Sequence, residues 1–114
     1  MADDSILDTT KQLLGIEKDV TDFDTEILIH INSVFDTFHQ LGLGPGTGFK
    51  IEDSSKLWSE YIQDTEHIES IRSLMYLRIR LLFDPPATSF GITAFEKEIE
   101  KMEWRLNVQV DPGV

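Results

Sequence analysis

The segment YLRIRLLFDPP, from Tyr76 to Pro86, lies at the end of a predicted helix that is apolar on two opposite sides. The helix spans about residues 66–83, and two prolines end it because proline lacks an N–H and disfavours helix in the residue before it. One apolar stripe contains Ile68, Ile71, Met75, Ile79 and Leu82, and the second contains Leu74, Leu77 and Leu81. A helix that is apolar nearly all round must be covered nearly all round. Either the rest of this chain wraps it, or a neighbouring subunit covers the second stripe. We predict the second, because the helix has more apolar surface than a fold of this size covers, so that sister molecules must cover the remainder.

Length and charge limit what the chain can be. Its 114 residues suffice for one domain, 1–114, with a single core of modest size. A net charge of -11 opposes binding to free nucleic acid unless the fold contains a basic patch. There is no cysteine, which excludes disulfides and thiolate metal sites. The start, MADDSILD, lacks the regions of a signal peptide, and no apolar run approaches the roughly 20 residues that span a bilayer. We therefore expect a soluble protein without membrane association.

Helical periodicity and turn signals predict an all-α fold, a small bundle of four to five helices. Besides the helix at 66–83, the expected elements are a short helix from Ser5 that stops at Gly15, a helix from Asp22 or Asp24 to about Leu41, a short helix after Ser54 or Ser55, and a last helix from about Ser89 to Asn107. A Gly/Pro-rich loop, GLGPGTGFKIEDSS, follows the second of these. The tail at 108–114, VQVDPGV, is predicted to be extended, either disordered or added as a strand to a partner's sheet edge.

Two large apolar residues fall on the polar sides of their predicted helices. The expected buried stripes are Ile27, Leu28, Ile31, Val34, Phe35, Phe38 and Leu41 in the second helix, and Ile92, Phe95, Ile99, Met102 and Leu106 in the last helix. Ile29 lies opposite the first stripe and is either an ordinary exposed residue or a contact with a second chain. Trp104 lies on the charged side of the last helix. Because tryptophan is favoured at interfaces, it is either an interface residue or a satellite core contact with the loop.

No group of residues has the spacing of a catalytic, cofactor or metal site. The three histidines are scattered, without an i,i+4 pair. DFDTE offers alternating acids, but Ile27 stands where a calcium loop requires glycine. GLGPGTGFK follows a helix rather than a strand and fails the spacing of a phosphate-binding loop. We therefore predict no catalytic residue, no cofactor, no metal ligand and no enzyme activity.

The basic residues of the 66–83 helix do not form one face. Residues 68–83 hold Glu69 against Arg72, Arg78 and Arg80, so three bases minus one acid give a net charge of +2. The three arginines point in different directions around the helix, which argues against a recognition helix for DNA. They either pair with local acids or reach an acidic neighbouring subunit. Arg78 is the favoured intersubunit candidate because it sits beside the apolar stripes.

Several motifs together resemble one known family. In chain order, they are ILIHINSVF, QLGLGP, GFKI (matched at Gly48, Phe49 and Ile51), LWSEY, YLRIRLLFDPP and EKEIEKMEWRLNVQ. They are similar to the phage head–tail connector (adaptor) family, also described as DNA-packaging or head-completion proteins of tailed phages and prophages. The resemblance covers roughly residues 6–109, and LRIRLLFDPP and EWRLNVQ are its most specific parts. The opening MADD and the final VDPGV lie outside it.

The resemblance implies an all-α subunit that joins about a dozen copies of itself into a ring. Such a ring docks under the portal protein, extends the channel through which DNA passes, and receives the next tail-side completion protein. The implied location is the head–tail interface of the virion, after assembly in the host cytoplasm. The predicted subunit or partner interface comprises Ile29, Leu74, Leu77, Arg78, Leu81, Trp104, Val108 and Val110.

Two other classes of function remain open on the sequence. One is a stand-alone acidic helical module that binds a protein, for instance a regulator that mimics DNA. The other is a small enzyme, which a dry apolar pocket with converging polar groups would favour. The first alternative does not explain a helix with two apolar stripes.

Overall fold

The computed structural model describes residues 4–62 and 67–110, and the side chains up to Leu106. Its five helices, in chain order, are α1 (Ile6–Leu13), α2 (Asp24–Gln40), α3 (Trp58–Tyr61), α4 (Ile68–Phe83) and α5 (Ser89–Val110). The described residues form no strand; an isolated antiparallel bridge joins Ser5 to Leu57. The predicted all-α bundle is therefore confirmed.

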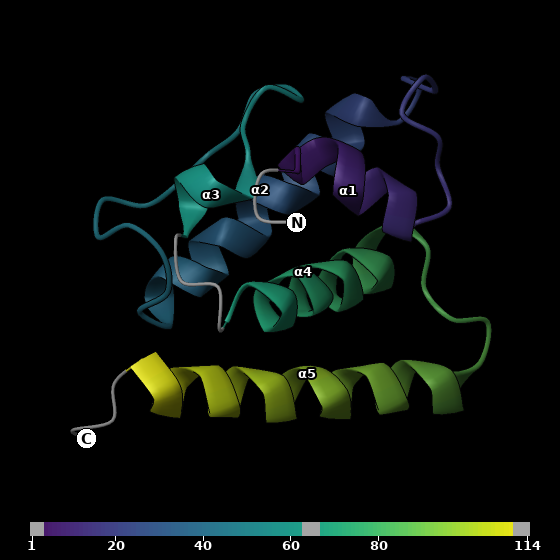
Figure 1. The fold of residues 1–114 in the computed structure, drawn as a ribbon. Helices are drawn as coiled ribbons and strands as arrows, with labels where there is room; N and C mark the ends of the chain where they lie inside the picture. The colour runs from purple at the N-terminus through teal and green to yellow at the C-terminus, as the bar shows by residue number, and fades with distance from the viewer. Residues whose placement is uncertain (1–3, 63–66, 111–114) are drawn as a thin grey trace.

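The helices are arranged with α4 in the middle. Figure 1 shows α1 and α2 on one side of α4 and the long α5 running along the other side. The packing agrees with this view, because α4 contacts α1, α2 and α5. The two apolar sides of α4 are thus covered by two different parts of the same chain. The expectation that a second subunit must cover one of them is wrong.

The individual residues of α4 show how this covering works. Leu74, expected on a free stripe, is completely buried, as are Ile71 and Ile79 of the other stripe. Leu77 and Leu81 are partly buried and pack against the same core. Leu82, expected to be buried, is 56% exposed. It belongs to the last turn of α4, just before Asp84, where the chain turns away.

An aromatic cluster fixes the short α3 against α2. The rings of Phe35 and Tyr61 have centroids 4.6 Å apart, and Phe49 lies 5.2 Å from each of them. Trp58 is buried, and its Nε1–H donates a hydrogen bond to Thr9 Oγ1 of α1 at 2.8 Å. The tilted Phe35–Tyr61 contact and the edge-to-face contacts of Phe49 add to the free energy of burial. They connect α2 and α3, and the hydrogen bond of Trp58 adds α1.

The glycine-rich loop is held by specific contacts rather than by a strand. Gly44 has φ +76, and an added Cβ there would come within 2.5 Å of Cε1 of Tyr61. The side chain of Asn32 in α2 holds the backbone of Ile51 twice. Its Nδ2 donates to Ile51 O at 2.9 Å, and its Oδ1 accepts from Ile51 N–H at 2.8 Å. The loop therefore has a defined course over the aromatic cluster.

A buried lysine organises the connection between α1 and α2. Lys11 is 1% exposed, and its Nζ donates to the carbonyl oxygens of Lys18 at 3.1 Å and Val20 at 2.6 Å. The same ammonium lies 2.8 Å from Oδ1 of Asp24, in the first turn of α2. Asp24 was expected as a possible N-cap of α2, but that position belongs to Phe23 and has no side-chain cap. The carboxylate instead neutralises a buried charge.

The ends of the helices follow the sequence signals in part. The expected caps of α2 and α3 are wrong, because Phe23 precedes α2 and Leu57, rather than Ser54 or Ser55, precedes α3. Ser5 caps α1 as predicted, because its Oγ accepts from Asp8 N–H at 3.2 Å. Gly15 and Gly42, just after α1 and α2, both have positive φ values, which glycine adopts readily. The last helix continues to Val110 rather than ending near Asn107, so residues 108–110 are helical where an extended chain was expected. Residues 111–114 lie outside the described part.

Candidate assembly surface

The three arginines of α4 all have partners within the chain. Arg78 pairs with Glu103 of α5 through both Nε and Nη2, which makes this ion pair a link between the two helices. Arg72 lies 3.6 Å from Asp4 and from Glu69 and stands over the ring of Trp58. Arg78 therefore has an acidic partner inside its own subunit, and its role between subunits stays a prediction.

Arg80 is engaged at the end of α4. Its Nη1 donates to Tyr76 Oη and its Nε donates to the carbonyl oxygen of Asp84, both at 2.9 Å. Its guanidinium also lies over the ring of Phe95 in α5. The hydrogen bond to Tyr76 raises the pKa of Arg80 above its ordinary value. The three arginines of α4 thus contact other parts of the same chain, and they do not form a basic face.

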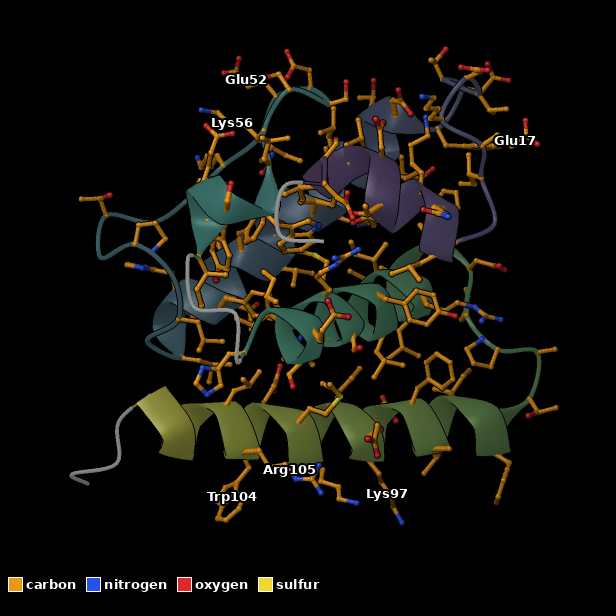
Figure 2. The ribbon with its side chains drawn as sticks, viewed as in Figure 1. Glu17, Glu52, Lys56, Lys97, Trp104 and Arg105 are labelled. Atoms are coloured by element: carbon orange, nitrogen blue, oxygen red, sulfur yellow. The ribbon has the colours of Figure 1, made fainter. Side chains whose placement is uncertain are left out.

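The outward side of α5 is the most exposed apolar surface that the structure describes on a helix. Trp104 is 68% exposed and Phe90 is 84% exposed. Figure 2 shows Trp104, Lys97 and Arg105 pointing away from the body of the protein. Trp104 therefore does not pack as a satellite core contact with the loop, and its role at an interface stays a prediction. Isolated exposed apolar residues are common, but an exposed tryptophan is less routine because it is large and favoured at interfaces.

The other predicted interface residues have separate positions. Ile29 is 62% exposed on α2, so it remains available to a partner. Leu74 offers no surface and is removed from the predicted interface. Val108 and Val110 belong to the last turn of α5, and their side chains lie outside the described part. The structure does not gather these residues into one patch.

An open hollow of about 670 Å³ lies beside α1, on its outer side. Its walls come from α1 and from the connection that follows it, and they include Asp4, Asp8, Glu17, Lys18 and Asp19. The sequence analysis missed this hollow. Only its acidity is visible in the sequence, since Glu17 and Asp19 belong to residues 15–26, where five acids oppose Lys18 alone.

The described residues contain no arrangement that supports a reaction. They hold no cluster of three or more His, Asp or Glu side chains placed for a metal ion. Two carboxyl or hydroxyl groups have shifted pKa values for local reasons. Hydrogen bonds from Ser55 lower the pKa of Asp53 in an exposed turn, and burial raises the pKa of the Tyr61 hydroxyl. Asp53 lies in an open surface hollow beside Lys50, Glu52 and Lys56, and its pKa is lowered rather than moved toward neutral pH.

The comparisons with known proteins give the chain its family. A family model described as phage connector protein matches residues 6–113, nearly the whole chain. The chain belongs to the phage connector family. No curated protein and no solved structure matches it.

Membership confirms the resemblance found in the sequence and identifies the connector as a structural phage protein. Connectors are virion components at the junction of head and tail, and they associate with head or tail proteins. In the part of the chain that the structure describes, none of the helices is both long and apolar enough to cross a membrane. An exposed aromatic helix face suits a protein whose work is contact with other proteins.

Proposed function

We propose that this connector assembles with copies of itself into a ring that docks under the portal and receives the tail-side completion protein. About a dozen copies would surround a channel for DNA, as in a closed assembly with heterologous contacts. Assembly takes place in the host cytoplasm, and the ring then stays in the virion. The observation that carries the proposal is the family match over residues 6–113.

The surface of the subunit supports this proposal, although α4 does not. Because the chain itself covers both sides of α4, excess apolar surface on that helix is no argument for a ring. The contacts are instead proposed at exposed apolar residues of other helices, namely Ile29 of α2 and Trp104 of α5. Val108 and Val110 continue the same end of α5 and remain proposed contacts.

Net charge supports the passage of DNA through the ring. A subunit with a net charge of -11, repeated around a channel, produces a negative potential that repels phosphate groups. DNA then slides through the hole without binding to a sequence. The three arginines of α4 do not oppose this, since each is paired with acidic or aromatic groups of its own chain.

Electron microscopy of the full-length protein mixed with its portal protein tests the ring. We expect a ring bound coaxially to one end of the portal. Rings alone would support self-assembly but contradict docking, and a persistent monomer that does not bind the portal would contradict both. Once the ring is imaged, reversing channel-facing acids to lysine should slow DNA packaging or ejection, and unchanged DNA passage would refute the electrostatic argument.

A further inference from the structure

We propose that the outer face of α5 docks into the acidic hollow beside α1 of the next copy of this chain. The inference rests on the proposed ring and adds to it which two faces of the subunit meet. It starts from two surfaces of opposite charge on one molecule. Their relative position on the subunit determines which partner each can meet.

The donor surface is a stripe along α5. Phe90, Lys97, Lys101 and Trp104 recur at spacings of seven, four and three residues, which places them on one face of an α-helix. The stripe is about 21 Å long at roughly 1.5 Å per residue. Arg105 adjoins Trp104 and adds a third positive charge. The acids of α5 lie to either side of the stripe, and Glu103 turns inward to Arg78.

The acceptor surface is the hollow of about 670 Å³ between α1 and the connection to α2. Four carboxylates line it, from Asp4, Asp8, Glu17 and Asp19, against one ammonium, from Lys18. Asp4 is already paired with Arg72, so the others provide most of the excess charge. The connection that forms one wall is held in place from below by the buried ammonium of Lys11. The hollow is therefore acidic, and one of its walls is held in position by hydrogen bonds from Lys11.

The two surfaces lie on opposite sides of the subunit. Figure 2 shows Glu17 at one side of the molecule and Trp104, Lys97 and Arg105 at the other, with α4 between them. The stripe of one subunit therefore cannot reach the hollow of the same subunit, but it can reach the hollow of a second copy. Contact between unlike faces is heterologous, so it repeats from subunit to subunit, and it forms a ring where the rotation per step closes.

Charge favours a second copy of the chain over other occupants of the stripe. A symmetric contact of α5 with α5 would bring three bases against three bases, which costs free energy. The net charge of -11 opposes binding of the stripe to DNA. The phosphate groups of a duplex would also offer no apolar partner to the exposed rings of Phe90 and Trp104. In the proposed contact, the tryptophan fills the hollow while bases meet carboxylates at its edge.

Cross-linking between introduced cysteines tests the contact, because the natural chain has no cysteine. Full-length Lys101→Cys and Asp19→Cys variants are mixed at about millimolar concentration, so that weak association is detected, and treated with a short bismaleimide. We expect covalent heterodimers. The matched control replaces Asp19→Cys with Ser73→Cys, an exposed position on α4, and should give about tenfold less product. Equal yields from the two mixtures, or no product from either, would overturn the proposal.

A charge exchange provides a second, independent measurement. Reversing the stripe with K97E, K101E and R105E should reduce self-association by about tenfold or more, and W104A should do the same. Adding E17K and D19K to the reversed chain should restore association, because the charges are complementary again. Failure of this rescue, while the variants keep their helical circular dichroism spectrum, would contradict the contact. Binding of duplex DNA that the stripe reversal abolishes would also contradict it, in favour of a nucleic-acid surface.

These outcomes separate the inference from the proposed function. If rings form on the portal but neither cross-linking nor charge exchange depends on α5, the ring proposal stands and the assignment of its faces is wrong. If the cross-link and the rescue are found but microscopy shows open filaments or pairs, the contact stands and the ring proposal is wrong. If no association is found by any measurement, both are wrong.

Discussion

Helices α4 and α5 pack against each other but differ in their positions in the protein. Both contain an apolar stripe and several charged residues, and each contributes one member of the Arg78–Glu103 pair. α4 lies between two layers of its own chain and has five buried apolar residues, whereas the described part of α5 has two, Ile99 and Leu106. Figure 1 shows that α5 has neighbours on one side only. The stability of the subunit is thus concentrated at α4, and its capacity for contact is concentrated at α5.

This difference explains why an apolar surface on a helix is weak evidence for a partner. The second stripe of α4 seemed to need another subunit, yet α5 of the same chain covers it. The outer face of α5 is less apolar by sequence, yet it is the face without a neighbour in the chain. The hydrophobic effect is non-directional and depends on the apolar area that is removed from water. An apolar stripe therefore indicates that something covers it, but it does not indicate whether the same chain or another chain does so.

The largest expected effect on the free energy of unfolding is at a buried residue of α4. Leu74→Ala should lower the free energy of unfolding by about 2–5 kcal/mol, because it creates a cavity at a fully buried position. Urea denaturation followed by circular dichroism measures this change. Leu82→Ala, on the same helix but 56% exposed, is the control and should stay within about 1 kcal/mol of the natural chain. Equal effects of the two substitutions would show that α4 is not enclosed.

A smaller loss is expected at the buried lysine. Lys11→Met should destabilise the protein by roughly 2–3 kcal/mol, because two carbonyl oxygens and the Asp24 carboxylate lose their donor. Hydrogen exchange should become faster in the connection between α1 and α2. Lys18→Met is the control, since Lys18 contributes its backbone carbonyl to this contact, and it should leave both measurements unchanged. A stable Lys11→Met protein with a protected connection would contradict the assigned role.

The ion pair between α4 and α5 should contribute less. Arg78→Met is expected to cost about 1 kcal/mol, because both side chains of the pair are partly exposed and water screens part of their attraction. A double-mutant cycle with Glu103→Gln measures the coupling between the two residues. A coupling near zero would mean that α5 is held to α4 by apolar contacts alone, which would widen the contrast between the two helices.

The smallest effect at neutral pH is expected at Tyr61. Burial raises the pKa of its hydroxyl, so the folded protein resists ionisation of this group while the unfolded chain ionises at about pH 10. Stability should therefore fall as pH rises above that value, and Tyr61→Phe should remove this part of the loss. The hydroxyl has no hydrogen-bond partner among the described residues, so the substitution should cost little at pH 7. Identical alkaline unfolding of both proteins would show that Tyr61 titrates normally.

Some errors of the sequence interpretation have a common physical cause. Leu82 follows the helical period of a buried stripe, but the stripe loses its cover at the last turn, where the chain leaves the core. Lys11 was overlooked because lysines are rarely buried. Its spacing from Leu7 and Leu14, four and three residues, marked it as a member of the inner face of α1. The stripe of Phe90, Lys97, Lys101 and Trp104 was also legible from spacing, although only Trp104 was singled out.

The sequence by itself determined the helices, most of their ends, the apolar stripes and the connector family, since these depend on backbone periodicity, capping residues and motifs that are local in the chain. Only the tertiary structure decided that α5 covers α4, that Arg78 meets Glu103, and that Lys11 closes over the carbonyls of Lys18 and Val20. These contacts join residues that are far apart along the chain or separated by an irregular connection. Their geometry follows from the packing of the whole molecule, which no local pattern encodes.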